Sequence, residues 1–296
     1  ALQHAITQVP LTARMARRFV AGETLPDALE AVRQLKVQGF DATLDHLGEN
    51  VTSEAEALAA ADGYLSALVA LSEAGLGGNV SVKLTQMGLD LGDDFCCDNV
   101  GRIVQRAAEL GGFVRIDMEG SPYTERTLAI YRRLAGQFAN VGIVIQAYLK
   151  RSQADVEQLI DEGIGRFRLC KGAYDEPAEI AFDSRARVTQ SLQSLARTAL
   201  DPEARAKRAY PAIASHDEAV TDFVRAYAYQ HQIPPSAFEF QMLYGIRREL
   251  QSRLVREGYR VRIYVPYGTH WYPYFMRRLA ERPANLLFFL RAFVGD

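Results

Sequence analysis

Short segments in which apolar and polar residues alternate recur eight times along the chain, and sequence of helical rhythm separates each from the next. Alternation with a period of two is typical of a β-strand, because successive side chains point to opposite faces of a sheet. The segments lie near residues 40–45, 80–84, 113–119, 141–146, 166–171, 211–216, 238–243 and 261–265. Their spacing of roughly 20 to 45 residues suits parallel strands joined through helices. We therefore predict eight repeated strand–helix units of the α/β class.

The two parities of these strands differ in polarity. One parity is apolar in three representative strands and comprises Val80, Val82, Leu84, Val114, Ile116, Met118, Val261, Ile263 and Val265. The other parity carries Lys83, Asp117, Glu119, Gln146, Arg168, Glu239, Gln241, Arg262 and Tyr264. An open, doubly wound sheet would more often show nearly continuous Val, Ile and Leu in its central strands. The pattern favours a closed (β/α)8 barrel of the TIM type, with the apolar parity facing the helices and the polar parity lining the barrel mouth.

Two regions stand outside the regular repeat. Residues 1–38 show helical patterns with caps, among them Thr24 followed by Pro26 and Asp27, which suit a first turn. We expect them to form a helical preface packed on a barrel of residues 39–296, whose length is close to that of a typical TIM barrel. In the longest connection, a second helix start at Asp201 and Pro202 predicts an extra helix.

Composition narrows the class of partner. The formal net charge is −2 and charged residues make up 24% of the chain, so bulk charge indicates neither disorder nor a nucleic-acid partner. The three cysteines form no CxxC pattern, and neither HxH nor HExxH occurs, so we expect a reducing compartment and no metal site. No apolar run approaches the length of a membrane span and no signal or transit pattern is present, which favours a soluble, cytoplasmic protein that acts on a small molecule.

Charged residues gather at the ends of the second and third strands, where the active sites of such barrels lie. Lys83 could fix an anionic group or form a Schiff base, or it could make a salt bridge with Asp117 on the neighbouring strand. Asp117 and Glu119, two residues apart on one strand face, suit general acid–base chemistry. A charge network with Lys83 and Arg115 explains the same two carboxylates equally well.

The fifth and sixth strands end in residues that suit a phosphate group. Lys171 offers a cation, and Gly172 lets the backbone approach a ligand closely. His216 suits a ring or a phosphate, although a lone histidine is more often structural. No GxGxxG motif follows any strand, so a dinucleotide held in Rossmann fashion is not indicated.

The stretch 260–282 combines the eighth strand with a helix that we expect to begin near Pro273. On that helix Arg277 and Arg278 lie about 100° apart, and Glu281 follows one turn later. Two guanidinium groups at the end of a strand can clamp a carboxylate. The alternative is a solvated Arg/Glu helix face.

Several motifs at successive strand ends carry a family resemblance. They are residues 168–174 (RLCKGAY), 215–217 (SHD), 240–245 (FQMLYG), 262–270 (RIYVPYGTH) and 274–281 (YFMRRLAE). In this order they resemble proline dehydrogenase, the FAD enzyme of proline catabolism, in its stand-alone bacterial form. The likeness spans the chain from about residue 40 to its end and implies a distorted (β/α)8 barrel with FAD, a nucleotide cofactor, lying over the strand ends.

The resemblance implies a role for each matching substrate-site residue. Arg277 and Arg278 match the pair that grips the proline carboxylate, with Lys83 as a third cation. Glu49 matches an acid that closes the site by pairing with Arg277. The residues that match the wall of the proline pocket are Asp117, Tyr174, Leu243 and Tyr264, with Tyr264 against the proline ring.

The resemblance also implies a set of flavin contacts. They are Gln146, Arg168, Lys171, Gly172, Ala173, His216, Gln241 and Glu281. Arg168 is expected near the flavin N5 edge, Lys171 near the pyrophosphate, and Glu281 as a bridge between arginine and flavin. Asp175 and Asp217 depart from the family pattern, with Asp217 standing where Asn commonly follows the histidine.

The function that the resemblance implies is oxidation of L-proline to 1-pyrroline-5-carboxylate by hydride transfer from C5 to flavin N5. A quinone then reoxidises the flavin, and the product passes to a separate pyrroline-5-carboxylate dehydrogenase. The apolar segment 284–294 suits packing on the barrel or on another subunit, and alternatively peripheral contact with the inner face of the cell membrane. Two other functions remain to be weighed, namely a Schiff-base aldolase using Lys83 or Lys171 and a non-catalytic ligand-binding barrel.

Overall fold

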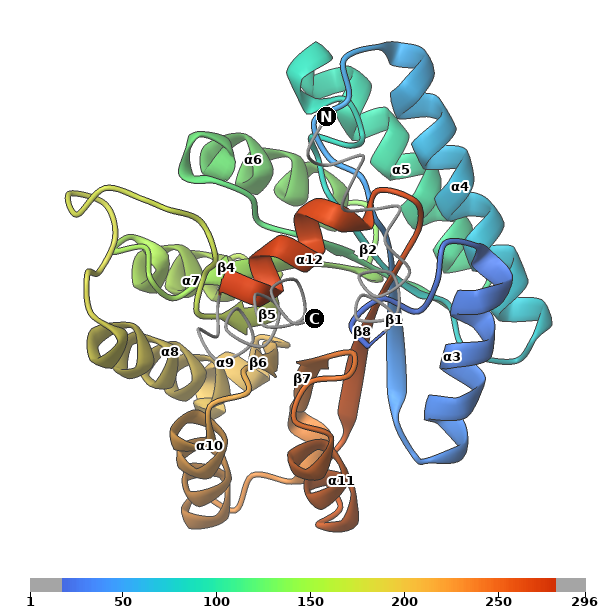
Figure 1. The fold of residues 1–296 in the computed structure, drawn as a ribbon. Coiled ribbons are helices and arrows are strands. Elements are labelled where there is room, and N and C mark those ends of the chain that lie inside the picture. Colours follow the sequence, from blue (N-terminus) through green and yellow to red (C-terminus); the bar gives the residue numbers. More distant parts are fainter. Residues whose placement is uncertain (1–17, 281–296) are drawn as a thin grey trace, which may run out of the picture.

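The computed structural model describes residues 18–280, and within them eight parallel strands close into a barrel in chain order (Figure 1). The strands are β1 (Asp41–His46), β2 (Asn79–Val82), β3 (Phe113–Ile116), β4 (Val141–Gln146), β5 (Arg166–Cys170), β6 (Tyr210–Ala214), β7 (Glu239–Leu243) and β8 (Val261–Tyr267). Strand β8 pairs with β1, with Tyr264 opposite Thr43, and this pairing closes the barrel. The predicted number, order and direction of the strands are confirmed, and with them the (β/α)8 class.

Helices surround the outside of the barrel, and the last described helix lies across its mouth (Figure 1). They are α3 (Leu25–Val37), α4 (Glu54–Glu73), α5 (Asp93–Glu109), α6 (Thr124–Ala135), α7 (Ser152–Asp161), α8 (Arg185–Leu200), α9 (Pro202–Ala206), α10 (Glu218–Gln230), α11 (Arg248–Arg256) and α12 (Trp271–Ala280). Short 3-10 turns η1 (Leu89–Leu91), η2 (Ser121–Tyr123) and η3 (Pro235–Ala237) lie in the loops. The short helix α9 is the predicted extra helix, and Asp201 caps it by accepting from the Glu203 backbone N–H at 2.9 Å.

Helix α3 begins where its cap predicts. The Thr24 hydroxyl accepts from the Asp27 N–H, and the Asp27 carboxylate accepts from the Thr24 N–H at 3.1 Å, a capping box that satisfies two backbone donors. The buried face of α3 packs against β8 and β1. Residues 1–17 lie outside the described chain, so the boundary between a helical preface and the barrel at residue 38 stays a prediction.

The two parities of the strands separate as expected. Val80, Val114 and Val261 are essentially excluded from solvent and belong to the core between the sheet and the helices. The opposite parity fills the barrel interior with charged and amide side chains rather than with hydrocarbon. There the guanidinium of Arg262 donates to Glu239 at 2.9 Å, and the Gln241 amide donates to the same carboxylate at 2.5 Å. Buried charges need such partners. The Gln241 amide oxygen also accepts from Arg168, which donates to Asp117, so these polar contacts continue from the barrel interior to its mouth.

Helix α4 qualifies one expectation about membranes. By length and composition it could span a bilayer, with a mean hydropathy of 1.2 over an 18-residue window, so the prediction that no run approaches that length is wrong for this segment. Its apolar character comes largely from alanine, and its buried side chains, among them Tyr64 and Leu68, pack in the core of the barrel. Helix α4 is thus one of the ring of helices that cover the sheet.

Candidate active site

A cavity of about 1110 Å³ opens at the C-terminal mouth of the barrel. Its lining includes every residue predicted from the sequence for the substrate or cofactor site, with two exceptions. Glu49 does not line the cavity itself but contacts Arg277, which does. Glu281 lies outside the described residues. Side chains from seven of the eight strand ends and from α12 therefore share one space, as the barrel predicts.

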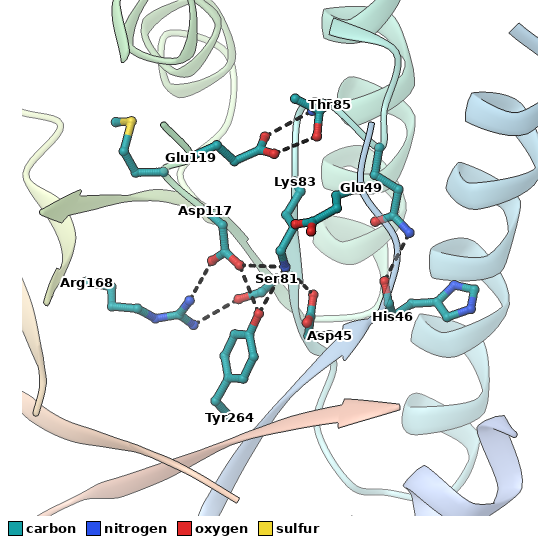
Figure 2. A network of polar contacts seen from close by, with 12 residues as sticks. Asp45, His46, Glu49, Ser81, Lys83, Thr85, Asp117, Glu119, Arg168 and Tyr264 are labelled. Carbon is teal, nitrogen blue, oxygen red and sulfur yellow. Dashed lines mark hydrogen bonds and ion pairs between the residues drawn. The ribbon is translucent and has the colours of Figure 1, made fainter. Parts of the chain in front are cut away.

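The amino group of Lys83, just past the end of β2, lies among three oxygens (Figure 2). It is 2.8 Å from a carboxylate oxygen of Asp45, 3.2 Å from one of Asp117 and 3.2 Å from the Tyr264 hydroxyl. Burial opposes its positive charge, but Asp45 and Asp117 outweigh burial and hold the pKa of Lys83 well above its ordinary value. Lys83 is therefore a permanent cation, and the predicted salt bridge with Asp117 is confirmed.

Asp117 has two cationic partners, Lys83 and Arg168 (Figure 2). Arg168 donates to it at 2.7 Å and to the Ser81 hydroxyl at 2.9 Å, so Arg168 rather than Arg115 is the second cation that contacts Asp117. Arg115 donates instead to the backbone carbonyls of Ile143 and Arg166. Burial would raise the pKa of Asp117, but Lys83 and Arg168 lower it, so its carboxylate stays ionised.

Tyr264 lies against these charges in the cavity wall. Its hydroxyl donates to Asp117 at 3.0 Å, and its ring lies 5.1 Å from the guanidinium carbon of Arg168. Burial and the nearby carboxylates of Asp117 and Asp45 raise the pKa of Tyr264 well above its ordinary value. The side chain therefore remains a neutral phenol whose apolar ring faces the cavity and whose hydroxyl is held by the charge cluster.

Helix α12 carries the two arginines across the barrel mouth (Figure 1). Its aromatic face, which includes Trp271 and Phe275, packs with Phe19 in a separate buried cluster. Trp271 begins the helix two residues before the expected start near Pro273, and its indole N–H donates to Glu23 at 3.1 Å. Because this face is anchored, the last turn presents the arginines to the cavity.

The two arginines have distinct neighbours. Arg277 donates to Glu49 at 2.9 Å, which confirms the pairing that the resemblance implies. Burial opposes the charge of Arg277, but Glu49 raises its pKa. The guanidinium of Arg278 lies over the Tyr274 ring at 5.1 Å from its centre. Both arginines line the same cavity as Lys83 and Tyr264, so the three cations predicted to bind a carboxylate are brought together.

The other side of the cavity combines a tight turn with a cation. Gly172 has a φ of +108°, and an added Cβ would lie 2.4 Å from the Tyr148 ring, so only glycine fits this turn. The ammonium group of Lys171 lies 2.6 Å from the Asp217 carboxylate and 2.8 Å from the Thr189 hydroxyl. The Lys171 bond is the main cause of the lowered pKa of Asp217.

Two further predicted cofactor residues lie at the mouths of β4 and β6. The Nε2 atom of His216 accepts a 3.0 Å bond from the Leu243 backbone N–H, a structural bond between the ends of the neighbouring strands β6 and β7, in addition to its place in the cavity wall. The Gln146 amide donates to the Met118 carbonyl at 3.2 Å. Its side-chain oxygen is buried, lines the cavity side of the barrel, and has no partner in the part of the chain that the structure describes. A buried acceptor of this kind suits a ligand N–H.

Several residues of the site were missed in the sequence. Asp45 is fully buried beneath Lys83 and shares its parity with Thr43 on a strand that alternates clearly, so the rule that found Lys83 also identifies it. Tyr148 and Thr189 lie on a loop and a helix, where no periodic signal marks them. Residues 18–280 contain no group of three or more His, Cys, Asp or Glu side chains that could hold a metal ion.

Comparison with known proteins agrees with this geometry. The family model described as proline dehydrogenase matches residues 28–291. The chain is 44% identical over 276 residues to "Proline dehydrogenase 1" of Bacillus subtilis (strain 168), covering 93% of this chain and 89% of that protein. It is 42% identical over 279 residues to the proline dehydrogenase of Deinococcus radiodurans, covering 93% and 88%.

A solved structure shares the fold. The crystal structure of proline utilization A (PutA) from Bdellovibrio bacteriovorus inactivated by N-propargylglycine matches with a TM-score of 0.84 and 29% identity. The match covers 90% of this chain and 32% of that longer one, so it concerns about a third of the second protein.

Proposed function

Since the chain belongs to the proline dehydrogenase family, we propose that it oxidises L-proline to 1-pyrroline-5-carboxylate in the cavity at the barrel mouth. The observation that carries this proposal is the meeting of Lys83, Arg277 and Arg278 around one space walled by Tyr264. Three cations suit an anionic group on the substrate, and guanidinium groups suit a carboxylate best because they offer paired donors. A free amino acid with a small apolar ring fits both features.

The residues of the cavity also fit FAD, which we propose as the cofactor. The cavity exceeds the volume of roughly 300–1,000 Å³ that is usual for small-molecule sites, so it has room for more than proline. Gly172 allows close backbone approach, Lys171 offers a cation for a phosphate, and the unpartnered oxygen of Gln146 offers an acceptor. Bound FAD supplies a two-electron acceptor, with its N5 atom as the hydride acceptor.

Proline oxidation removes a hydride from C5 and a proton from the nitrogen, and a C=N bond forms between them. Such a transfer depends above all on position. Arg277 and Arg278 hold the carboxylate, and the Tyr264 ring packs against the substrate and excludes water. The positive charge of Lys83 is shared with Asp45 and Asp117, so it adds a favourable field from beneath the site. Asp117, whose pKa is lowered, is poorly suited to take the amine proton.

The charge state of Lys83 argues against an aldolase. A Schiff base forms from a neutral amine, but Asp45 and Asp117 hold the pKa of Lys83 far above neutrality. The second candidate lysine, Lys171, makes an ion pair with Asp217 in the cavity wall. We propose further that a quinone reoxidises the cofactor, that the product passes to a separate dehydrogenase, and that the enzyme works in the cytoplasm with peripheral membrane contact. The apolar segment 284–294, which prompted the last point, lies outside the described residues.

Absorbance of the purified protein tests the proposal directly. We expect a flavin spectrum that bleaches on anaerobic addition of L-proline and stays unchanged with an acyclic amino acid of similar size. Release of the cofactor by acid and its separation by chromatography identifies FAD against shorter flavins. A colourless protein that borohydride traps with a carbonyl substrate would support the aldolase, and the absence of both results would support a ligand-binding barrel.

A further inference from the structure

The loop that carries Glu49 is held in place by one threonine. This loop joins β1 to α4 over residues 47–53. The Asn50 backbone N–H donates to the Thr85 hydroxyl oxygen at 3.1 Å, and the Val51 N–H donates to the Thr85 carbonyl at 3.3 Å. Asn50 has a φ of +57°, in the left-handed region, which asparagine adopts more readily than most other residues and which turns the chain at this point. Thr85 therefore holds the turn immediately after Glu49.

Thr85 is in turn held by Glu119 (Figure 2). The Glu119 carboxylate accepts from the Thr85 backbone N–H at 3.0 Å and from its hydroxyl at 2.5 Å. A hydroxyl has one hydrogen and two lone pairs. Because the hydrogen is given to Glu119, the lone pairs of the Thr85 oxygen are free to accept the Asn50 N–H. Glu119 is only 5% exposed, so this arrangement has no competition from bulk water.

The chain of bonds ends at the substrate arginine. Glu49 follows directly on residues fixed by the barrel, since the Leu47 N–H donates to the Tyr267 carbonyl at 2.8 Å. Its carboxylate meets Arg277 at 2.9 Å, and both side chains remain partly exposed, at 23% and 30%. Such a pair gains little from burial, so the direction in which the loop presents Glu49 decides whether the contact forms.

We propose that Glu119, acting through Thr85, is a positioning residue that sets Glu49 against Arg277 and thereby controls the affinity for proline. This inference rests on the proposed function of Arg277 in holding the substrate carboxylate. Glu119 itself is not among the residues that line the cavity, so it does not contact the substrate. Its loss therefore weakens proline binding more than it slows turnover.

Two substitutions test the link. Glu119→Gln puts an amide N–H₂ where one acceptor stood, so one of the two Thr85 donors faces another donor. Thr85→Val keeps the shape of the side chain and removes the hydroxyl, whereas Thr85→Ser keeps the hydroxyl. We expect each of the first two to raise the KM for L-proline about fivefold, as loss of one hydrogen bond predicts, with kcat changed by less than about twofold. In Thr85→Ser the KM for L-proline should stay close to the wild-type value.

Glu176 supplies a matched control. It accepts from the Ser121 N–H at 2.7 Å and from the Ser121 hydroxyl at 2.5 Å, which is the same pair of bonds at a different place on the barrel mouth. Those bonds join the loop after β5 to the turn after β3 and do not involve Glu49. Glu176→Gln should therefore leave the KM for proline near that of the wild type.

Hydrogen exchange followed by mass spectrometry gives a readout that does not depend on activity. Exchange in the peptide covering residues 47–53 should be faster in Glu119→Gln and Thr85→Val than in the wild type, and unchanged in Glu176→Gln. A double variant gives a further test. In a Glu49→Gln background, Glu119→Gln should add no further rise in KM, because the Glu49–Arg277 contact that Glu119 positions is already lost.

The results separate this inference from the function on which it rests. An active wild type in which Glu119→Gln leaves KM and loop exchange unchanged would overturn the inference alone. A rise in KM that persists undiminished in the Glu49→Gln background would also overturn it, because the effect would not pass through Glu49. Failure of L-proline to reduce the flavin of the wild type would instead overturn the proposed function.

Discussion

Removal of the Arg277 guanidinium should affect proline binding in two ways. Arg277→Met deletes a charged hydrogen bond to the substrate carboxylate, a contact that contributes about 1.5–3 kcal/mol. It also leaves the Glu49 carboxylate without its partner, since in the wild type Glu49 lies 2.9 Å from Arg277. In the variant Glu49 therefore faces the carboxylate of the substrate. We therefore expect the KM for L-proline to rise by about 10- to 150-fold, since 1.4 kcal/mol corresponds to a factor of ten.

Stability should change little in the same variant. The Arg277–Glu49 pair is partly exposed, and such pairs contribute about 0–1 kcal/mol to folding. Arg132→Met is a suitable control, because Arg132 makes an ion pair of 2.8 Å with Glu162 at a similar exposure on the outer helices. Thermal unfolding should shift by a similar small amount in both variants, whereas only Arg277→Met should raise the KM.

The double variant Arg277→Met, Glu49→Gln tests the electrostatic part of this reasoning. Without the arginine, Glu49 only repels the substrate, so its neutralisation should recover part of the lost affinity. In the wild-type background the same Glu49→Gln change should weaken binding, because Glu49 then orients Arg277. The assay is steady-state oxidation of L-proline with an artificial electron acceptor over a range of proline concentrations. A KM within about threefold of wild type in Arg277→Met would refute the carboxylate clamp.

Three further outcomes are expected. Gly172→Ala places a Cβ 2.4 Å from the Tyr148 ring at a φ of +108°, so it should weaken FAD binding at least about tenfold in a titration of the apoprotein. Asp217→Asn keeps a side chain that can cap helix α10 and frees Lys171 from its 2.6 Å ion pair. FAD should therefore bind more tightly in the same titration of the apoprotein, because Lys171 is then available to a phosphate. Weaker binding would contradict the assignment of Lys171 to a phosphate. Burial opposes ionisation of Asp117, but Lys83 and Arg168 lower its pKa below the ordinary value of 3.8. The ionised carboxylate therefore stabilises the fold above about pH 4, and this stabilisation is lost as pH falls through the lowered pKa. Urea unfolding of Asp117→Asn should therefore show a loss of about 3–5 kcal/mol near neutrality that shrinks in strong acid, and a loss independent of pH would contradict the ion pairs.

Local patterns were sufficient to predict the barrel. Most of the strands are short and alternate apolar with polar residues, so the period of two identifies them without knowledge of their neighbours. Strand β4 is buried along its whole length, and its apolar run of Ile143, Val144 and Ile145 marks it instead. Eight such segments at helical spacing leave few other topologies. The same parity rule placed Lys83 and Asp117 on adjacent strands, because parallel strands in chain order bring their C-terminal ends together. Periodicity therefore predicted that the two side chains could meet, and the structure shows their salt bridge.

Motif resemblance extended the prediction to the roles of the remaining residues. It placed Arg277 with Glu49, which lie 228 positions apart, and their contact is present. The contribution of each residue to flavin or proline binding stays a prediction, as does every statement about Glu281 and segment 284–294, which lie outside the described residues.

The fold class, the parity of the charged residues and the family could be predicted from the sequence, because they depend on local spacing and on residue identity. Which of the possible partners each charge contacts became known from the folded structure. Lys83 could have paired with Asp117 alone, but the pairing of β1 with β2 also brings Asp45 to it, and the closure of β8 on β1 brings Tyr264. The link from Glu119 through Thr85 to the loop of Glu49 likewise joins three separate strand ends. Such contacts depend on distances of about 3 Å between residues far apart in the chain, and no local pattern specifies those distances.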